Sequence, residues 1–230
     1  MKTVTRWLRN ILIFFFASTI LAVVILKYIP VYITPLMLIR CVESVIDGKE
    51  PVINHHWVPL EEISRHLPQA VMASEDNLFL KHKGFDLEQI QKAQIEAQEG
   101  KRQRGASTIS QQTARNVFLW QKRSWLRKGL EAYFTFLIEN IWGKERIMEV
   151  YLNSIEMGKG IYGAEAVARI NFKTTPDKLT RDQCAYIAVS LPNPLVRDSA
   201  HPTAKMKKMH NTILKRMNQI DQFPKDLCAQ

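Results

Sequence analysis

The chain has 230 residues, of which 46% are hydrophobic, and a formal net charge of +10. This length suits one globular domain plus an anchor, and the apolar content allows a buried core. The charge favours an anionic partner: nucleic acid, an acidic membrane surface or a phosphorylated ligand. Cys41, Cys184 and Cys228 lack the spacing of a zinc site, and an odd number of cysteines argues against a disulfide framework.

An uncharged run over residues 10–26 follows a basic segment, residues 1–9. Its apolar character continues for the roughly 20 residues that a helix needs to cross a bilayer. A cleaved signal peptide is the alternative, but no small-residue cleavage site follows the run. We therefore expect an uncleaved transmembrane helix over residues 10–30. The basic segment should stay in the cytoplasm, with the rest of the chain outside it.

The membrane-proximal segment, residues 31–56, contains a second apolar stretch. Residues 32–46 predict a helix, with Pro35 near its start and Gly48 just past its end. Amphipathicity alone does not decide whether this helix lies on a membrane surface or packs in the core. Residues 51–59 are the one segment that looks extended.

From Pro59 onward the apolar spacing is helical. Leu60 to Val71 predict a helix that leads into Glu75. Asp86 is expected to cap the next helix, which Gly100 closes.

The remaining helices show their own start signals. We expect them to begin after Ser107 or Thr108, after Ser124, at Lys144, after Thr180 and near Met206. The pattern predicts a mostly α fold in one domain over residues 57–230, preceded by the single anchor.

The adjacent carboxylates of Glu75 and Asp76 follow an apolar run at a helix end. A general base needs such a carboxylate if burial and neighbours raise its pKa toward neutrality. The simpler interpretation is a pair of solvated surface charges.

Two further polar clusters allow two interpretations each. Gln111, Gln112 and Arg115 lie near a helix start after a basic, glycine-bracketed loop, and amides there suit sugar hydroxyls or solvent. Glu131 follows Arg127 and Lys128 at helical spacing, which fits either an ordinary surface salt bridge or one wall of a cleft.

Five motifs in this order resemble the peptidoglycan glycosyltransferase family, in its monofunctional biosynthetic form from Gram-negative bacteria. They are the segments Ser74–Asp86, Gly105–Asn116, Arg127–Glu131, Lys144–Gly158 and Leu191–Pro194. The resemblance runs from about Trp57 to the last helix and leaves no room for a transpeptidase domain.

The resemblance implies a lysozyme-like helical domain of two lobes, with a cleft between a larger head and a smaller membrane-facing jaw. It implies an inner-membrane protein with a single span and a periplasmic catalytic domain that acts in cell wall biosynthesis. The growing glycan, linked to a lipid diphosphate, would be transferred to the sugar 4-hydroxyl of lipid II, a disaccharide-pentapeptide on undecaprenyl diphosphate. The β-1,4 link forms with inversion, and undecaprenyl diphosphate leaves.

The resemblance also assigns residue roles. Glu75 is expected to be the general base, and Glu131 the second essential glutamate, which orients or assists the leaving diphosphate. The expected substrate-binding residues are Asp76, Phe79, His82, Ser107, Gln111, Gln112, Arg115, Arg123, Arg127 and Lys128. Of these, the four cations should face the diphosphate.

No organic cofactor is expected, and the diphosphate leaves room for a divalent cation, Mg or Mn. Other cell-wall synthesis or division proteins are expected partners, whereas nucleic acid is not, because the basic domain lies outside the cytoplasm. The chain departs from the family pattern at Arg115, where lysine is usual, and at Ala106, where many relatives have glycine. The alternatives are a lytic enzyme of lysozyme type and a membrane-anchored scaffold without activity.

Overall fold

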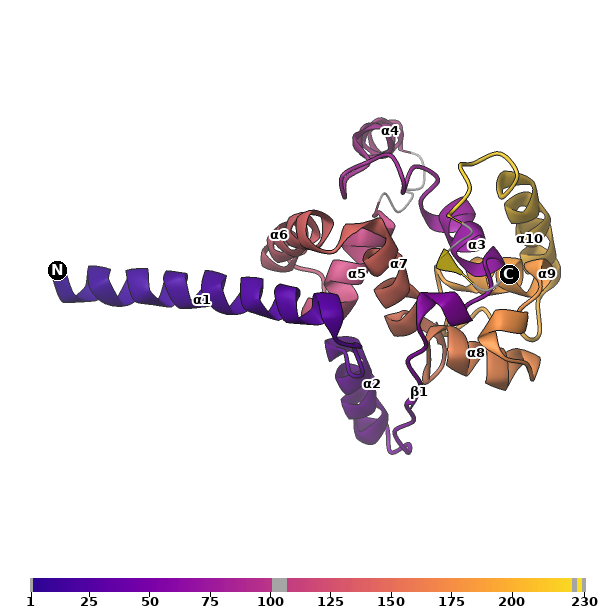
Figure 1. Ribbon diagram of the computed structural model, residues 1–230, viewed down its shortest axis with the longest axis horizontal. Helices are drawn as coiled ribbons and strands as arrows, with labels where there is room; N and C mark the ends of the chain where they lie inside the picture. Colours follow the sequence, from indigo (N-terminus) through magenta and orange to yellow (C-terminus); the bar gives the residue numbers. More distant parts are fainter. Residues whose placement is uncertain (1, 101–106, 225–226, 229–230) are drawn as a thin grey trace.

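The computed structural model describes residues 2–100, 107–224 and 227–228. A compact helical body carries one long projecting helix, as Figure 1 shows, so the predicted mostly α fold with a single N-terminal apolar helix is confirmed. The elements are α1 (Lys2–Tyr28), α2 (Pro35–Ile46), β1 (Asn54–His55), η1 (Leu60–Glu62), α3 (His66–Glu75), α4 (Leu87–Gln98), α5 (Ile109–Phe118), α6 (Trp125–Ile141), α7 (Gly143–Ser154), β2 (Glu156–Gly158), β3 (Ile161–Tyr162), α8 (Gly163–Phe172), η2 (Pro176–Lys178), α9 (Arg181–Ser190) and α10 (Ala204–Arg216).

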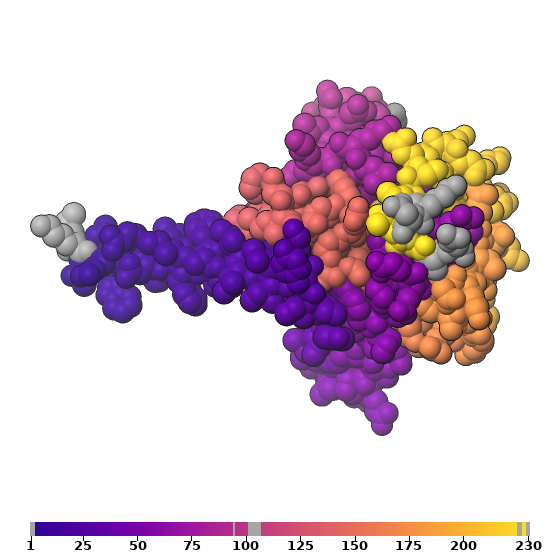
Figure 2. Space-filling view, in the orientation of Figure 1, coloured from indigo at the N-terminus to yellow at the C-terminus, as the bar shows by residue number. Residues whose placement is uncertain are grey.

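Helix α1 stands clear of the body over most of its length (Figure 2). Its segment Thr3–Tyr28 is long and apolar enough to cross a membrane, which is compatible with a single-pass anchor. Its C-terminal end is docked on the body. Trp142 Nε1 donates to the Val23 carbonyl over 2.7 Å, and Arg146 Nη2 donates to the Leu26 carbonyl over 2.8 Å. The Leu26 carbonyl is one of the last four of α1, which have no donor within the helix, so Arg146 supplies a hydrogen bond that a free helix end would lack.

The predicted helix near residues 32–46 is confirmed as α2, and its two sides differ. On one side Leu36 and Met37 are buried with Tyr162, and Arg40 forms an ion pair of 3.1 Å with Glu156. The other side exposes four apolar residues, Leu38, Val42, Val45 and Ile46. One face of α2 therefore belongs to the core, while the opposite face is an apolar surface.

A three-stranded sheet has the order β1-β3-β2, with β1 parallel and β2 antiparallel to β3. The prediction of a single extended segment was therefore wrong, because residues 156–162 form a short hairpin. Buried Asn153 holds the segment that follows β1 to the end of α7: its Oδ1 accepts from the Val58 N–H over 3.0 Å, and its Nδ2 donates to the Val58 carbonyl over 2.8 Å. A Cβ at Gly163 would lie 2.5 Å from the Asn153 carbonyl, so only glycine fits there.

Helix α3 is the central element of the body and packs against both α9 and α10. We expected one helix from Leu60 to Glu75, but the chain bends at Ile63 and Ser64 between η1 and α3. The bend is fixed because the Ser64 N–H donates to the Pro176 carbonyl over 2.9 Å and its hydroxyl donates to the Leu179 carbonyl over 2.8 Å. These tertiary hydrogen bonds override the local helical pattern.

Helix α5 packs against α6 and α7 and so collects residues from both. The predicted helix starts are confirmed, because each cap hydroxyl or carboxylate accepts from a backbone N–H in the first turn. The capping residues are Asp86, Thr108, Ser124 and Thr180. These caps fix where α5 and α6 begin and thereby where their polar side chains point.

Candidate active site

Glu75, the last residue of α3, is held by neutral donors. Ser74 Oγ donates to its Oε1 over 3.2 Å, and Gln112 Nε2 donates to its Oε2 over 3.0 Å. Burial raises the pKa of Glu75 above its usual value, and these two hydrogen bonds oppose that rise. A carboxylate in this setting can accept a proton, which is what a general base requires.

The Gln112 amide has a defined orientation. The hydroxyl of Tyr151, a fully buried residue, is 3.2 Å from Gln112 Oε1. Burial raises the pKa of Tyr151 well above its usual range, so this phenol stays protonated and donates. The amide oxygen therefore faces Tyr151, and the amide N–H faces Glu75.

Asp76 joins the end of α3 to the start of α5. Its Oδ2 accepts from the Ile109 N–H and from His82 Nε2, each over 2.9 Å. The Gly84 N–H donates to His82 Nδ1 over 3.0 Å, so the proton of a neutral His82 lies on Nε2. Both Asp76 and the His82 side chain are buried, so this network fixes the end of α3 that carries Glu75, while a contact of either residue with the substrate stays a prediction.

The turn beneath this network leaves no space for a larger residue. Gly84 has φ +89°, and a Cβ there would lie 2.8 Å from Thr135 Cγ2 and 2.9 Å from Glu139 Cγ. Phe79 is fully buried, and Lys144 Nζ lies 4.6 Å from its ring centroid. Phe79 thus presents no surface to a substrate, contrary to our expectation of direct contact.

Glu131, on α6, lies in a cationic cluster. The residue is 1% exposed. Its Oε2 is 2.5 Å from Arg127 Nη1, and its Oε1 pairs with Lys128 Nζ. Arg115 approaches from α5; burial lowers the pKa of its guanidinium, while the charge of Glu131 opposes that effect. The cluster is more positive than one carboxylate can balance, which suits an anionic ligand.

Buried donors in this cluster have no hydrogen-bond partner among the residues that the structure describes. They are Arg115 Nε and Arg127 Nε, and Asn116 Nδ2, on the next residue of α5, is another buried donor of this kind. Buried polar groups are normally satisfied, so the two guanidinium donors beside Glu131 point to a ligand that supplies acceptor atoms.

The other predicted substrate residues are distributed unevenly. Gln111 is buried, and its Oε1 accepts from the Thr108 N–H over 3.0 Å, so this amide oxygen closes a helix cap. Arg123 is exposed, and Ser107 is half-buried at the start of α5. Gly105 and Ala106 lie outside the described residues. The structure therefore brings Gln112 to Glu75 and Arg115 to Glu131, whereas Gln111 is buried in the cap of α5.

A protein-only metal site does not fit these residues. Both oxygens of Glu131 are engaged by Arg127 and Lys128. Within the described ranges, no three His, Cys, Asp or Glu side chains gather closely enough to hold an ion. A divalent cation at the diphosphate stays a prediction in which the diphosphate supplies the ligands.

Sequence reasoning missed two residues near Glu75. Tyr151 lies in the helix predicted from Lys144, and only its hydroxyl indicates a polar partner. Arg197 Nη1 donates to the Val189 carbonyl over 2.9 Å, and its charge opposes the burial effect on the pKa of Glu75. Arg197 follows the Leu191–Pro194 motif by three residues, and no spacing rule links it to the site.

Comparison with known proteins gives a consistent result. The family described as Transglycosylase matches residues 43–218. A biosynthetic peptidoglycan transglycosylase of Bacteroides thetaiotaomicron is 59% identical over 97% of this chain and 90% of its own length. A protein of the same name from Caulobacter vibrioides is 52% identical over 84% of this chain and 84% of its own length. Another, from Bdellovibrio bacteriovorus, is 46% identical over 92% of this chain and 86% of its own length. The chain belongs to the transglycosylase family of peptidoglycan synthesis.

Proposed function

We propose that the protein polymerises glycan chains of peptidoglycan by transferring a lipid-diphosphate-linked glycan onto the sugar 4-hydroxyl of lipid II. The observation that supports this proposal is that one helix, α5, approaches two glutamates that lie in different environments, Glu75 and Glu131. Gln112 on α5 contacts Glu75, and Arg115, three residues later, lies within the electrostatic reach of Glu131. Helix α5 thus connects the proton acceptor, Glu75, with the cationic cluster around Glu131, which can bind an anion.

Glu75 is the general base in this proposal. The acceptor hydroxyl attacks the anomeric carbon of the donor and passes its proton to a Glu75 oxygen. The new C–O bond forms as the bond to the leaving diphosphate breaks, which inverts the anomeric centre. Gln112 and Ser74 keep the carboxylate from rotating, so its free lone pairs face the attacking oxygen.

The Glu131 cluster binds the leaving group. Charge builds on the diphosphate oxygens as the bond breaks, and Arg115, Arg127 and Lys128 stabilise that charge. Glu131 orients two of these cations, since each of its oxygens binds one of them. The unpartnered donors of Arg115 and Asn116 would find acceptors on the diphosphate.

The protein is proposed to span the bacterial inner membrane once, with its catalytic domain in the periplasm. The basic residues of the N-terminal segment support this orientation. The exposed apolar face of α2 follows α1 after a short connection and supports contact with the membrane surface. Lipid II would therefore reach the site from the same membrane.

The test is polymer formation from labelled lipid II by the full-length protein in detergent. Long glycan that a lytic enzyme can digest supports the proposal. Trimming of preformed glycan without polymer formation would instead show a lytic enzyme. Activity on neither substrate would favour a scaffold.

A further inference from the structure

A buried ion pair lies where three helices of the body meet. Glu139, near the end of α6, has a side chain that is 7% exposed, and its Oε1 binds Lys144 Nζ at the start of α7 over 2.7 Å. The same oxygen accepts a hydrogen bond from Ser110 Oγ, in the first turn of α5. Figure 1 shows α5, α6 and α7 side by side, and each of these helices packs against the other two. The mechanism above gives this ion pair no role, although α5 carries Gln112 and Arg115.

The Glu139 carboxylate has little freedom to move. Its Cγ lies 2.9 Å from the position that a Cβ would take at Gly84, so the side chain lies directly against the backbone of that turn. A carboxylate removed from water needs a cation, which Lys144 supplies. A hydroxyl that donates to an ionised carboxylate forms a stronger hydrogen bond than one that donates to a neutral group. Ser110, which is fully buried, is therefore held by a fixed and strong acceptor.

Three consecutive residues at the start of α5 are held by other parts of the chain. The Thr108 hydroxyl donates to the Gly84 carbonyl over 2.7 Å, and the N–H of the next residue donates to Asp76 Oδ2 over 2.9 Å. The Ser110 hydroxyl is the third donor and binds α6. The first two contacts lead back to the segment between α3 and α4, whereas the third fixes α5 against α6 and α7. Together they restrict sliding and rotation of α5 at its first turn.

A small movement of α5 would change the contact with the base. Gln112 lies two residues beyond Ser110, and its Nε2 donates to Glu75 Oε2 over 3.0 Å. Hydrogen bonds from N–H to oxygen fall mostly between about 2.7 and 3.2 Å, so a displacement of about 0.5 Å would lengthen this one beyond that range. The position of the first turn of α5 therefore determines whether Gln112 meets Glu75.

We propose that Glu139 is a positioning residue for the transfer reaction, which acts on the base, Glu75, through α5. Glu139 binds Ser110 and so fixes the first turn of α5, which keeps the Gln112 amide on the carboxylate of the base. Lys144 acts in the same network, because it neutralises Glu139 and holds its oxygen in place. Neither member of the ion pair touches the substrate. The inference rests on the proposed function for the role of Glu75 as the base.

The charged and titratable groups around Glu75 come from three parts of the chain. Asp76 follows it in sequence, Arg197 lies beyond α9, and the Tyr151 phenol belongs to α7. Gln112 on α5 adds a neutral amide. A substitution in the first turn of α5 changes none of these groups, so it can alter the pKa of Glu75 only by moving them.

The first test is the pH dependence of kcat/KM for lipid II with the full-length protein. Ser110→Ala removes the hydroxyl and leaves the ion pair of Glu139 and Lys144 intact, so this variant should fold. Gln112 should then donate less well to Glu75, which raises the pKa of the base and moves the acid limb to higher pH. We expect kcat/KM to fall about threefold on the acid limb and less on the plateau. Glu139→Gln should move the limb in the same direction.

A double variant shows which route the effect takes. Glu139 also lies against Gly84, whose N–H binds His82, so an effect could pass through that turn instead. If Gln112 carries the effect, Ser110→Ala should add nothing to the shift that Gln112→Ala causes. Additive shifts, an unmoved limb in Ser110→Ala, or an equal loss of activity at every pH would each overturn the proposal.

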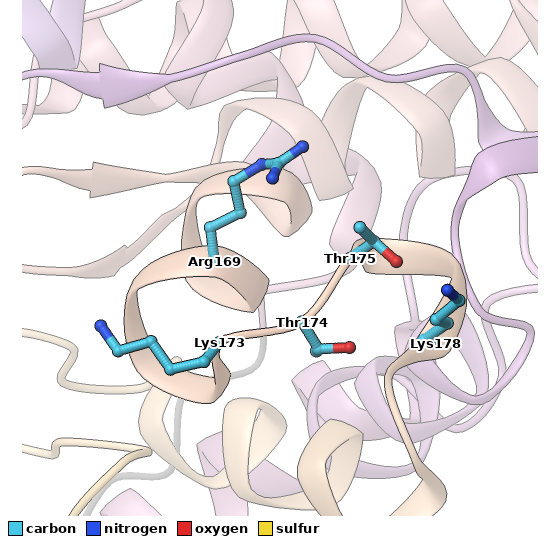
Figure 3. A pocket seen from close by; sticks show the side chains of 5 residues that line it. All are labelled: Arg169, Lys173, Thr174, Thr175 and Lys178. Atoms are coloured by element: carbon cyan, nitrogen blue, oxygen red, sulfur yellow. The ribbon is translucent and has the colours of Figure 1, made fainter.

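The matched control is Glu165→Gln on α8, which also removes a carboxylate from an ion pair. The Glu165 side chain is 12% exposed and pairs with Arg169. Figure 3 shows Arg169 on α8, at a hollow that Lys173 and Lys178 also line. Helix α8 packs against α7 and the sheet. Glu165→Gln should keep the wild-type acid limb, and a limb that moved as far as in Ser110→Ala would overturn the proposal, because the shift would then follow any loss of an ion pair or hydrogen bond.

The second test needs no activity. In an NMR titration of the full-length protein with carboxyl-labelled glutamate, the signal that is absent from Glu75→Gln identifies Glu75. This signal should titrate at higher pH in Ser110→Ala than in the wild type, and equal titration would contradict the proposal. The expected shift in a protein that forms no polymer would contradict the proposed function and leave the coupling between Glu139 and Glu75 in place.

Discussion

The two glutamates of the site lie in opposite environments. Glu75 accepts hydrogen bonds from the neutral side chains of Ser74 and Gln112, and burial raises its pKa. Glu131 is more deeply buried, but Arg127 and Lys128 each bind one of its oxygens. The same side chain is thus prepared for proton transfer in one place and for organising cations in the other.

This difference shows that burial alone does not define a base. Each lone pair that Glu131 directs at a cation is unavailable to a substrate proton, whereas Glu75 has weak partners and keeps acceptor capacity. Substitutions of Glu75 and of Glu131 should therefore have different effects on activity and stability.

Glu75→Gln should produce the largest loss of activity. It keeps the size of the side chain but removes the proton acceptor, and general bases contribute about 10²- to 10⁴-fold to rate. Polymer formation from labelled lipid II measures the loss. A variant with more than a tenth of wild-type activity would contradict the base assignment.

The same variant should gain stability at neutral pH. A carboxyl whose pKa is raised in the folded state contributes stability below its unfolded pKa, and this contribution is lost as the pH rises through the folded pKa. Glutamine has no such loss. We expect a higher Tm for Glu75→Gln at pH 7 and a smaller difference at pH 4, as measured by circular dichroism.

Glu131→Gln should lower stability instead. It leaves Arg127 buried without its ionic partner, and breaking a buried ion pair costs about 3 kcal/mol. Urea unfolding of the two variants side by side tests the comparison directly. A Glu131→Gln protein as stable as Glu75→Gln would show that the cluster is not a buried ion pair in solution.

Gln112→Ala should move the acid limb of the pH–rate profile to higher pH. The Gln112 amide donates to the carboxylate and lowers the pKa of Glu75, so its removal raises that pKa. Activity should then fall at a higher pH as acid is added. Tyr151→Phe should cause a smaller shift in the same direction, because it only frees the amide to turn. Lower activity with an unmoved limb would indicate a purely structural role.

Arg115→Lys should have the smallest effect. It restores the cation that is usual in the family and keeps the charge beside Glu131, but it removes the planar donor fork. We expect kcat/KM for lipid II to change by about threefold or less, since one hydrogen bond is exchanged for another. Arg115→Gln, which removes the charge, is the matched comparison and should lose more activity.

The helices and their caps could be predicted from the sequence because their signals are local. Thr180 and Gln183 form the capping box that their spacing indicates, and of the two candidate caps Ser107 and Thr108 it is Thr108 that caps α5, in a box with Gln111. The bend at Ser64 and the pairing of the 156–162 hairpin with β1 could not be predicted, since both depend on hydrogen bonds to distant segments.

The site was predictable in its chemistry and only partly in its geometry. The motifs named Glu75 and Glu131, yet the burial of Phe79 and Gln111 follows from tertiary packing. The contact between Tyr151 and Gln112 joins residues 39 apart in sequence and appears only when α5 packs against α7.

The docked end of α1 has a mechanical consequence. At about 1.5 Å per residue, its uncharged run over residues 10–26 extends to about 26 Å, close to the roughly 30 Å hydrocarbon layer. The contacts from Trp142 and Arg146 fix the end of α1 to the body, so no hinge separates them. If α1 spans the membrane as proposed, any tilt that a thinner or thicker bilayer imposes on the helix tilts the body by the same angle. Bilayer thickness would then set the angle at which the cleft meets the membrane, and thicker or thinner lipids would change the polymerisation rate without touching the substrate.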